Sequence, residues 1–125
     1  MIQTLPLVAL GGAVGAALRH VANGTALRVF GPGFPFGTLI VNVLGSLLMG
    51  LLFVLLAERG AGRFSPFVLT GMLGGFTTFS AFSMDALVLV ERGQTMAALA
   101  YVAASVLCSL LAVFAGVALA RGLPV

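Results

Sequence analysis

The chain has 125 residues, of which 61% are hydrophobic and 7% are charged, and six arginines against three acidic residues give a net charge of +3. A soluble domain carries about 25% charged residues, so this chain has too few charged side chains to cover a soluble surface. The composition excludes a soluble protein and predicts one domain over residues 1–125 embedded in a lipid bilayer, and without a basic stripe no nucleic-acid partner is expected.

Four apolar segments are each long enough to cross a membrane, which takes about 20 residues in a helix. They cover about 5–21, 36–57, 66–90 and 95–120. Gly11 and Gly15 on the first segment are spaced four apart, a pattern typical of close helix packing. A loop rich in glycine and proline is expected over 23–35. The sequence therefore predicts an all-α integral membrane protein with four transmembrane helices.

The third segment is the unusual one, because it places two glycines and four hydroxyls within Gly74–Ser83. A straight helix over 66–90 would be about 37 Å long, whereas the hydrocarbon core is about 30 Å thick. The segment must therefore tilt or break, and Gly74-Gly75 is the predicted break. Hydroxyls in lipid need partners, so we expect the functional site in this stretch.

The arginines are evenly divided between the two expected membrane faces. Arg59, Arg63 and Arg121 lie on the side of the termini, and Arg19, Arg28 and Arg92 on the other. An even count predicts no preferred orientation by the positive-inside rule. Two copies of opposite orientation could then pair about an axis in the membrane plane. A fixed orientation set by another feature is the alternative.

Three of the segments carry a polar or aromatic stripe at helical spacing. The stripes are Thr38, Asn42 and Ser46; Phe79 with Phe82 and Ser80 with Ser83; and Tyr101, Ser105 and Ser109. One interpretation is that these groups only bind neighbouring helices to one another. The other is an anion path, because convergent donors and the positive edges of aromatic rings can replace an anion's hydration shell.

Three motifs resemble those of the Fluc/CrcB family of bacterial fluoride channels. They are Gly-Gly-Ala-Val-Gly-Ala-Ala-Leu-Arg at 11–19, the stretch 36–45 with Asn42, and Gly-Gly-Phe-Thr-Thr-Phe-Ser-Ala-Phe-Ser at 74–83. The resemblance covers nearly the whole chain, and the third motif is its most specific part. It implies a passive fluoride-selective channel, built as an antiparallel, dual-topology homodimer in the bacterial inner membrane, with a structural sodium ion at the dimer interface.

The resemblance also implies roles for particular residues. The fluoride pore would be lined by Asn42, Phe79, Phe82, Ser80, Ser83, Thr38, Tyr101, Ser105 and Ser109. Arg19 would stand at the pore vestibule, and main-chain carbonyls of Gly74 and Thr77 would hold the sodium ion. Ala81 departs from the family pattern, which often has threonine there, and removes one hydroxyl from the polar track.

Two alternatives to a channel are a proton-coupled multidrug antiporter and a non-transporting assembly subunit. An antiporter needs a carboxylate deep in a span, and Asp85 lies toward the end of its segment. An assembly subunit would use every polar stripe for helix packing. An enzyme is not expected, because His20 and the serines form no base–nucleophile pair and the sequence has no metal-ligand cluster.

Overall fold

The structure is a computed structural model that describes residues 1–123, and its regular elements in that range are all helical. In chain order they are η1 (Ile2–Thr4), α1 (Leu5–Phe30), α2 (Phe36–Glu58), η2 (Gly62–Phe64), η3 (Pro66–Leu73), α3 (Gly74–Phe76), α4 (Phe79–Glu91) and α5 (Thr95–Gly122). They form four stretches long and apolar enough to cross a membrane: Ile2–Phe30, Phe36–Glu58, Gly62–Glu91 and Thr95–Gly122. The prediction of a four-span, multi-pass membrane protein is confirmed.

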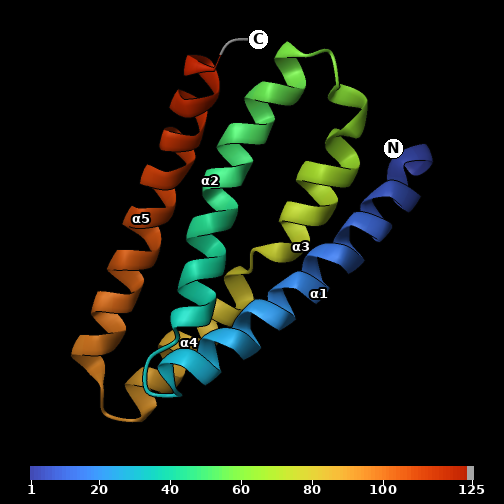
Figure 1. The fold of residues 1–125 in the computed structure, drawn as a ribbon. Helices are drawn as coiled ribbons and strands as arrows, with labels where there is room; N and C mark the ends of the chain where they lie inside the picture. The colour runs from blue at the N-terminus through green and yellow to red at the C-terminus, as the bar shows by residue number, and fades with distance from the viewer. Residues whose placement is uncertain (124–125) are drawn as a thin grey trace.

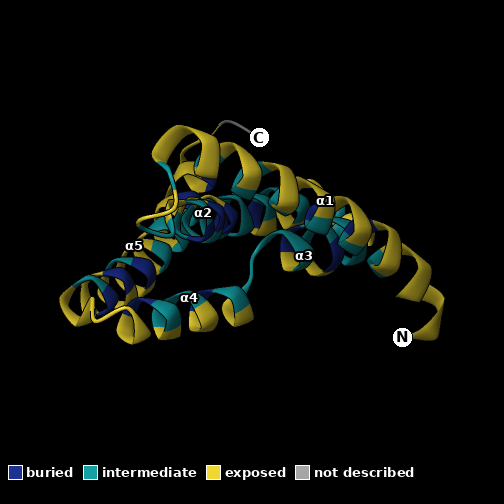
Figure 2. Ribbon diagram, turned by 90° about the horizontal axis from the view of Figure 1, so that it is seen from below, coloured by how far each residue is buried: buried dark blue, intermediate teal, exposed yellow. Residues whose placement is uncertain are grey.

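The four spans run alternately up and down, so both ends of the chain lie toward the same end of the molecule (Figure 1). α2 packs mainly against α5, and α1 packs mainly against η3 and α3. α4 turns away from α1 and packs against the lower part of α5. The outward faces of the helices are exposed along most of their length, as Figure 2 shows. These faces are largely apolar, which suits contact with lipid.

Glycines allow the backbones of α2 and α5 to touch. A Cβ on Gly50 would overlap the carbonyl oxygen of Val113, and a Cβ on Gly116 would overlap that of Leu47. Small residues at such crossings bring helices together in the absence of a hydrophobic driving force within lipid. Gly11 and Gly15 do the same for α1 against η3, as their spacing predicted.

The third span is broken, as expected, and the extended residues are Thr77 and Thr78, which begin two residues beyond Gly75. Gly74 is still helical, with φ −62° and ψ −37°, whereas Thr77 and Thr78 are extended. A Cβ on Gly75 would lie 2.7 Å from the carbonyl oxygen of Gly12, so this glycine permits close packing and does not break the helix. The β-branched threonines, which favour extended backbone, supply the break.

The loop predicted over 23–35 was wrong, because α1 continues to Phe30 and only residues 31–35 connect it to α2. Gly31 ends the helix with a positive φ of 77° and an N–H bond to the carbonyl of Leu27. Arg19 therefore lies eleven residues before the end of α1, within the helix.

Candidate functional site

A cavity of about 470 Å³ opens at the break of the third span, between α2, α4 and α5. It brings together five of the predicted pore residues, namely Asn42, Phe79, Phe82, Ser105 and Ser109. Ser46, Thr77 and Thr78 also line it. We call it the break cavity. Among its lining residues none is acidic or basic, so its polar groups are amides and hydroxyls.

Asn42 holds the broken backbone in place. Its Nδ2 donates to the carbonyl oxygen of Thr78 at 3.0 Å, and the N–H of Thr78 donates back to Oδ1 at 2.8 Å. This pair replaces hydrogen bonds that an unbroken helix would have made within the third span. Because a carboxamide nitrogen carries two hydrogens, one donor of Asn42 remains for a group in the cavity.

Thr78 starts α4 and was missed as a site residue. Its Oγ1 accepts a hydrogen bond from the N–H of Ala81 at 3.1 Å and lies 3.3 Å from Oγ of Ser80. An extended threonine directly before an apolar helix is a typical N-cap, and this signal was present in the sequence. The hydroxyl of Thr77 is used differently, because it donates to the carbonyl of Leu73 at 3.0 Å.

Ser105 lines the break cavity and carries a hydroxyl that is unpartnered within residues 1–123. The residue is 6% exposed, and its Oγ is buried with no hydrogen-bond partner in the described part of the chain. Burying an unpaired hydroxyl is unfavourable, so such a group marks a place where a ligand or water is expected. Ser109 follows one turn later on α5 and is half-buried in the same lining.

Two phenylalanines form one wall of the break cavity. The rings of Phe79 and Phe82 are 5.4 Å apart and inclined at 65°, an edge-to-face arrangement. Phe82 is 9% exposed, whereas Phe79 is 77% exposed on the surface of the chain. Ser80 and Ser83 are also exposed and do not line the cavity, and the Oγ of Ser83 donates to the carbonyl of Phe79.

Tyr101 and Thr38 lie beyond Phe82 and outside the break cavity. The Tyr101 ring is fully buried and packs on Phe82 at 5.3 Å and edge-on to Phe34 at 5.5 Å. Its hydroxyl donates to Oδ2 of Asp85 at 3.0 Å. The sequence signalled a role for Asp85 only by its position one turn after Phe82, and the tyrosine partner was not foreseen.

Arg19, the residue predicted at the pore vestibule, is not part of the lining of the break cavity. Its Nε donates to the carbonyl oxygen of Gly75 at 3.1 Å. Carbonyls at the end of a helix lack intrahelical partners and attract positive charge. Arg19 therefore stabilises the end of α3 from within the chain.

The predicted sodium ligands are main-chain groups beside this arginine. The N–H of Thr78, which would bond the carbonyl of Gly74 in a continued helix, donates to Asn42 instead. The carbonyl of Gly74 is thus without that partner, and the residue lies on the exposed surface of the chain. Within residues 1–123 no cluster of three or more His, Cys, Asp or Glu side chains could hold a metal.

Fold and site together define a small multi-pass membrane protein with an uncharged polar cavity at a broken span. A family model described as CrcB-like protein, Camphor Resistance (CrcB), matches residues 6–117, and the chain belongs to this family. A relative from Cereibacter sphaeroides is 59% identical over 122 residues, which is 98% of each chain. Relatives from Paracoccus denitrificans and Mesorhizobium japonicum are 57% and 50% identical, and all three are named fluoride-specific ion channel FluC.

Proposed function

We propose that the chain is a passive, fluoride-selective channel that lets fluoride leave the cytoplasm. The observation that carries this proposal is the break cavity, whose lining includes Ser105, with a buried hydroxyl unpartnered in the described residues, and Asn42, with a spare donor. The names of relatives that match 96 to 98% of the chain support the same ion. A channel carries out no covalent chemistry, so the protein is not an enzyme.

Selectivity follows from the donors that replace water around the ion. A small anion that enters the break cavity loses hydration and regains hydrogen bonds from Asn42, Ser105 and Ser109. The edges of Phe79 and Phe82 present the positive part of the ring quadrupole. A larger halide has a lower charge density and gains less from these donors, while it needs more room between the rings.

The pore needs a second copy of the chain. Phe79, Ser80 and Ser83 belong to the predicted pore set yet lie exposed on α4, so one chain supplies only part of the path. A second copy packed on this face would enclose them. We propose an antiparallel, dual-topology homodimer, because three arginines toward each end of the spans leave no orientation bias.

A sodium ion at the dimer interface fits the main-chain oxygens at the break. The carbonyl of Gly74 lacks its helical partner, and Thr77 is extended immediately after α3, so both oxygens can turn outward. Hard cations prefer such oxygen ligands, and the C-terminal end of a helix favours positive charge. The ion would act structurally and hold the two copies together. The bacterial inner membrane is the proposed location.

The alternatives receive less support from the same geometry. A proton-coupled antiporter needs an ionisable group in its binding cavity, and the lining of the break cavity contains none. A purely assembling subunit would pair its buried hydroxyls, whereas the Oγ of Ser105 has no partner in the described residues.

The proposal is tested by asking whether fluoride efflux requires a second route by which potassium can leave the liposomes. Liposomes that contain purified protein and potassium fluoride are diluted into fluoride-free buffer, and external fluoride is followed with an electrode. A passive channel moves net charge, so efflux should need valinomycin to release potassium. If efflux needs no valinomycin and its rate depends on a proton gradient, the result would support the proton-coupled antiporter.

A further inference from the structure

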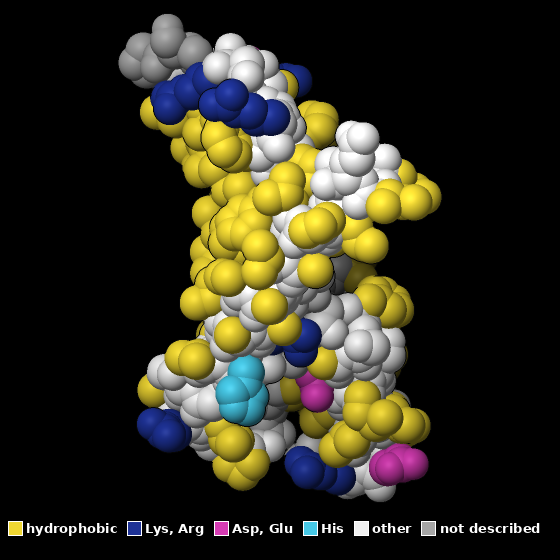
Figure 3. All heavy atoms as spheres, turned by 90° about the vertical axis from the view of Figure 1, so that its right-hand side faces the viewer, with side chains coloured by type: hydrophobic (Ala, Val, Ile, Leu, Met, Phe, Trp, Pro, Cys, Tyr) yellow, Lys and Arg dark blue, Asp and Glu magenta, His cyan; other side chains and the backbone are white. Residues whose placement is uncertain are grey.

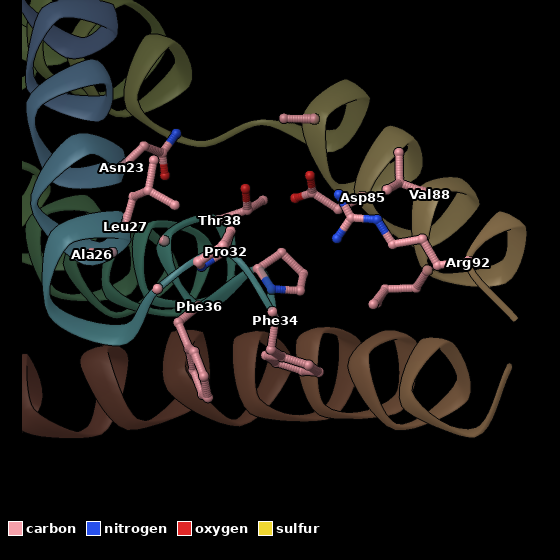
Figure 4. A pocket seen from close by; sticks show the side chains of 16 residues that line it. Asn23, Ala26, Leu27, Pro32, Phe34, Phe36, Thr38, Asp85, Val88 and Arg92 are labelled. Carbon is pink, nitrogen blue, oxygen red and sulfur yellow. The ribbon is translucent and has the colours of Figure 1, made fainter. Parts of the chain in front are cut away.

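A second cavity, of about 350 Å³, lies at the end of the molecule that holds the α1–α2 loop and the α4–α5 turn (Figure 4). Asn23 from α1, Thr38 from α2, and Asp85 and Arg92 from the region of α4 line it. We call it the turn cavity. It shares no lining residue with the break cavity.

The two cavities are separated by a thin aromatic wall. Phe82 lines the break cavity and packs on Tyr101, whose hydroxyl donates to Asp85 in the turn cavity. Thr38, a predicted pore residue, opens into the turn cavity and not into the break cavity. The proposed path would therefore continue past Tyr101 into the turn cavity, at the end of the molecule.

This end of the path poses an electrostatic problem for an anion. The carboxylate of Asp85 faces the same space and repels negative charge. Arg92 is the one cationic residue that lines the turn cavity, and it lies at the C-terminal end of α4 (Figure 4). No ion pair within 4.0 Å joins Arg92 to an acidic group of the described chain, so its guanidinium is available to a mobile ion.

Asn23 adds a neutral donor to the same cavity. Its Oδ1 is buried and has no partner in the described residues, and it rests against Gly37. Its Nδ2 makes no hydrogen bond to the described residues either, so the amide donors of this lining residue are unused. Charged side chains gather at this end and at the opposite end of the molecule, with an apolar surface between them (Figure 3).

We propose that the turn cavity is an anion-binding mouth, in which Arg92 and Asn23 bind fluoride as it passes between water and Tyr101. The proposal rests on the proposed channel function. Arg92 offsets the charge of Asp85 and raises the local anion concentration, the effect by which charged clefts accelerate association. A structural role for Arg92 at the end of α4 would instead affect stability alone.

The test measures fluoride efflux from liposomes at low and high ionic strength, with potassium isethionate as the added salt. In Arg92→Gln we expect efflux about tenfold below wild type near 0.01 M salt, because an electrostatic on-rate effect of that size is ordinary. Near 1 M salt, where the Debye length is about 3 Å, the difference should fall within about twofold. Arg92→Lys should conduct as wild type does.

Arg28→Gln is the matched control, because Arg28 is an exposed arginine at the same end that does not line the turn cavity. It should change efflux by less than about twofold. Adding Asp85→Asn to Arg92→Gln removes the repulsion and should restore most of the efflux at low salt.

Equal efflux by wild type and Arg92→Gln at low salt would overturn this proposal, as would an equal loss in Arg28→Gln. A loss in Arg92→Gln that persists unchanged at high salt, with a lower unfolding temperature, would also overturn it in favour of a structural role. If the wild-type protein passes no fluoride in the same liposomes, the proposed function itself fails.

Discussion

Asn42 and Ser105 both line the break cavity, but only the Asn42 side chain is hydrogen-bonded to the rest of the described chain. Asn42 is bound on both sides to the backbone of Thr78, whereas Ser105 is buried without a partner in the described residues. Removing the Asn42 side chain therefore removes two hydrogen bonds to Thr78, whereas removing the Ser105 hydroxyl removes none within the described residues. Stability and conduction should therefore both fall when Asn42 is removed, whereas conduction alone should fall when the Ser105 hydroxyl is removed.

Asn42→Ala should lose both stability and fluoride efflux. The N–H and carbonyl of Thr78 would lose their partner, which costs about 1–3 kcal/mol for each buried unsatisfied group. Fluoride efflux from liposomes should fall by about tenfold or more, since 1.4 kcal/mol corresponds to tenfold. Asn42→Asp keeps the acceptor for the Thr78 N–H and loses the donor, so it should unfold at a higher temperature than Asn42→Ala. Unchanged efflux in Asn42→Ala would contradict its assignment to the path.

Ser105→Ala should lower efflux while leaving stability almost unchanged. Because the hydroxyl has no partner in the described residues, its removal leaves no other group unsatisfied. The free energy of unfolding in detergent should change by no more than about 1 kcal/mol. Fluoride efflux should fall severalfold because an ion donor is gone. Thr25→Ala is the control, because the Thr25 hydroxyl is exposed and bonds only within α1. Equal efflux in Ser105→Ala and wild type would show that the hydroxyl does not contact the ion.

At the scale of elements, the four spans and their order could be predicted from the sequence, because long apolar stretches are a strong signal. The exact break and the end of α1 could not. Both involve contacts between spans: Gly75 approaches Gly12 too closely for a side chain, and Arg19 in the middle of α1 donates to the carbonyl of Gly75. A glycine pair alone does not show whether it bends a helix or lets it pack.

The crossing of α2 and α5 should tolerate no side chain at Gly50. A Cβ there overlaps the backbone of Val113, and overpacking costs about 1–3 kcal/mol. Gly50→Ala should therefore lower the unfolding temperature in detergent. Gly24→Ala is the matched change, because Gly24 is helical with open space around it and should be stabilised by up to about 1 kcal/mol. Similar unfolding temperatures for the two variants would argue against the backbone contact.

The hydroxyl of Thr78 should stabilise the protein by capping the N-terminus of α4. Thr78→Val keeps the shape and the preference for extended backbone, but loses the acceptor for the Ala81 N–H, which costs about 1 kcal/mol. Thr78→Ser keeps the acceptor and should unfold close to wild type. The two variants are compared by thermal unfolding, and equal loss in both would mean that the methyl group, not the cap, supports the break.

At the scale of the whole molecule, the proposed pore would need a second copy of the chain. Candidate pore residues lie partly inside the chain, as Ser105 and Phe82 do, and partly on its surface, as Phe79 does. The sequence predicted which residues form polar and aromatic stripes, because their spacing shows which share a helix face. It could not show that Phe82 and Tyr101 separate two cavities, because that depends on how α4 meets α5.

Dual topology predicts that each end of the chain is found on both sides of the membrane. In a Cys108→Ala background, Gln94→Cys lies in the exposed α4–α5 turn and Gly62→Cys lies at the opposite end. An impermeant thiol reagent added outside sealed vesicles should label about half of each variant. Labelling of only one of them from outside would show a fixed orientation and contradict the antiparallel dimer.

The selectivity of the purified protein tests the central claim most directly. Fluoride and chloride efflux are measured in parallel from liposomes loaded with each salt, with valinomycin present and the amount of protein held constant. The account predicts rapid fluoride release and chloride release no faster than from protein-free liposomes, because the break cavity combines uncharged hydrogen-bond donors with a wall of two aromatic rings. Equal rates for the two anions, or no fluoride release, would contradict it.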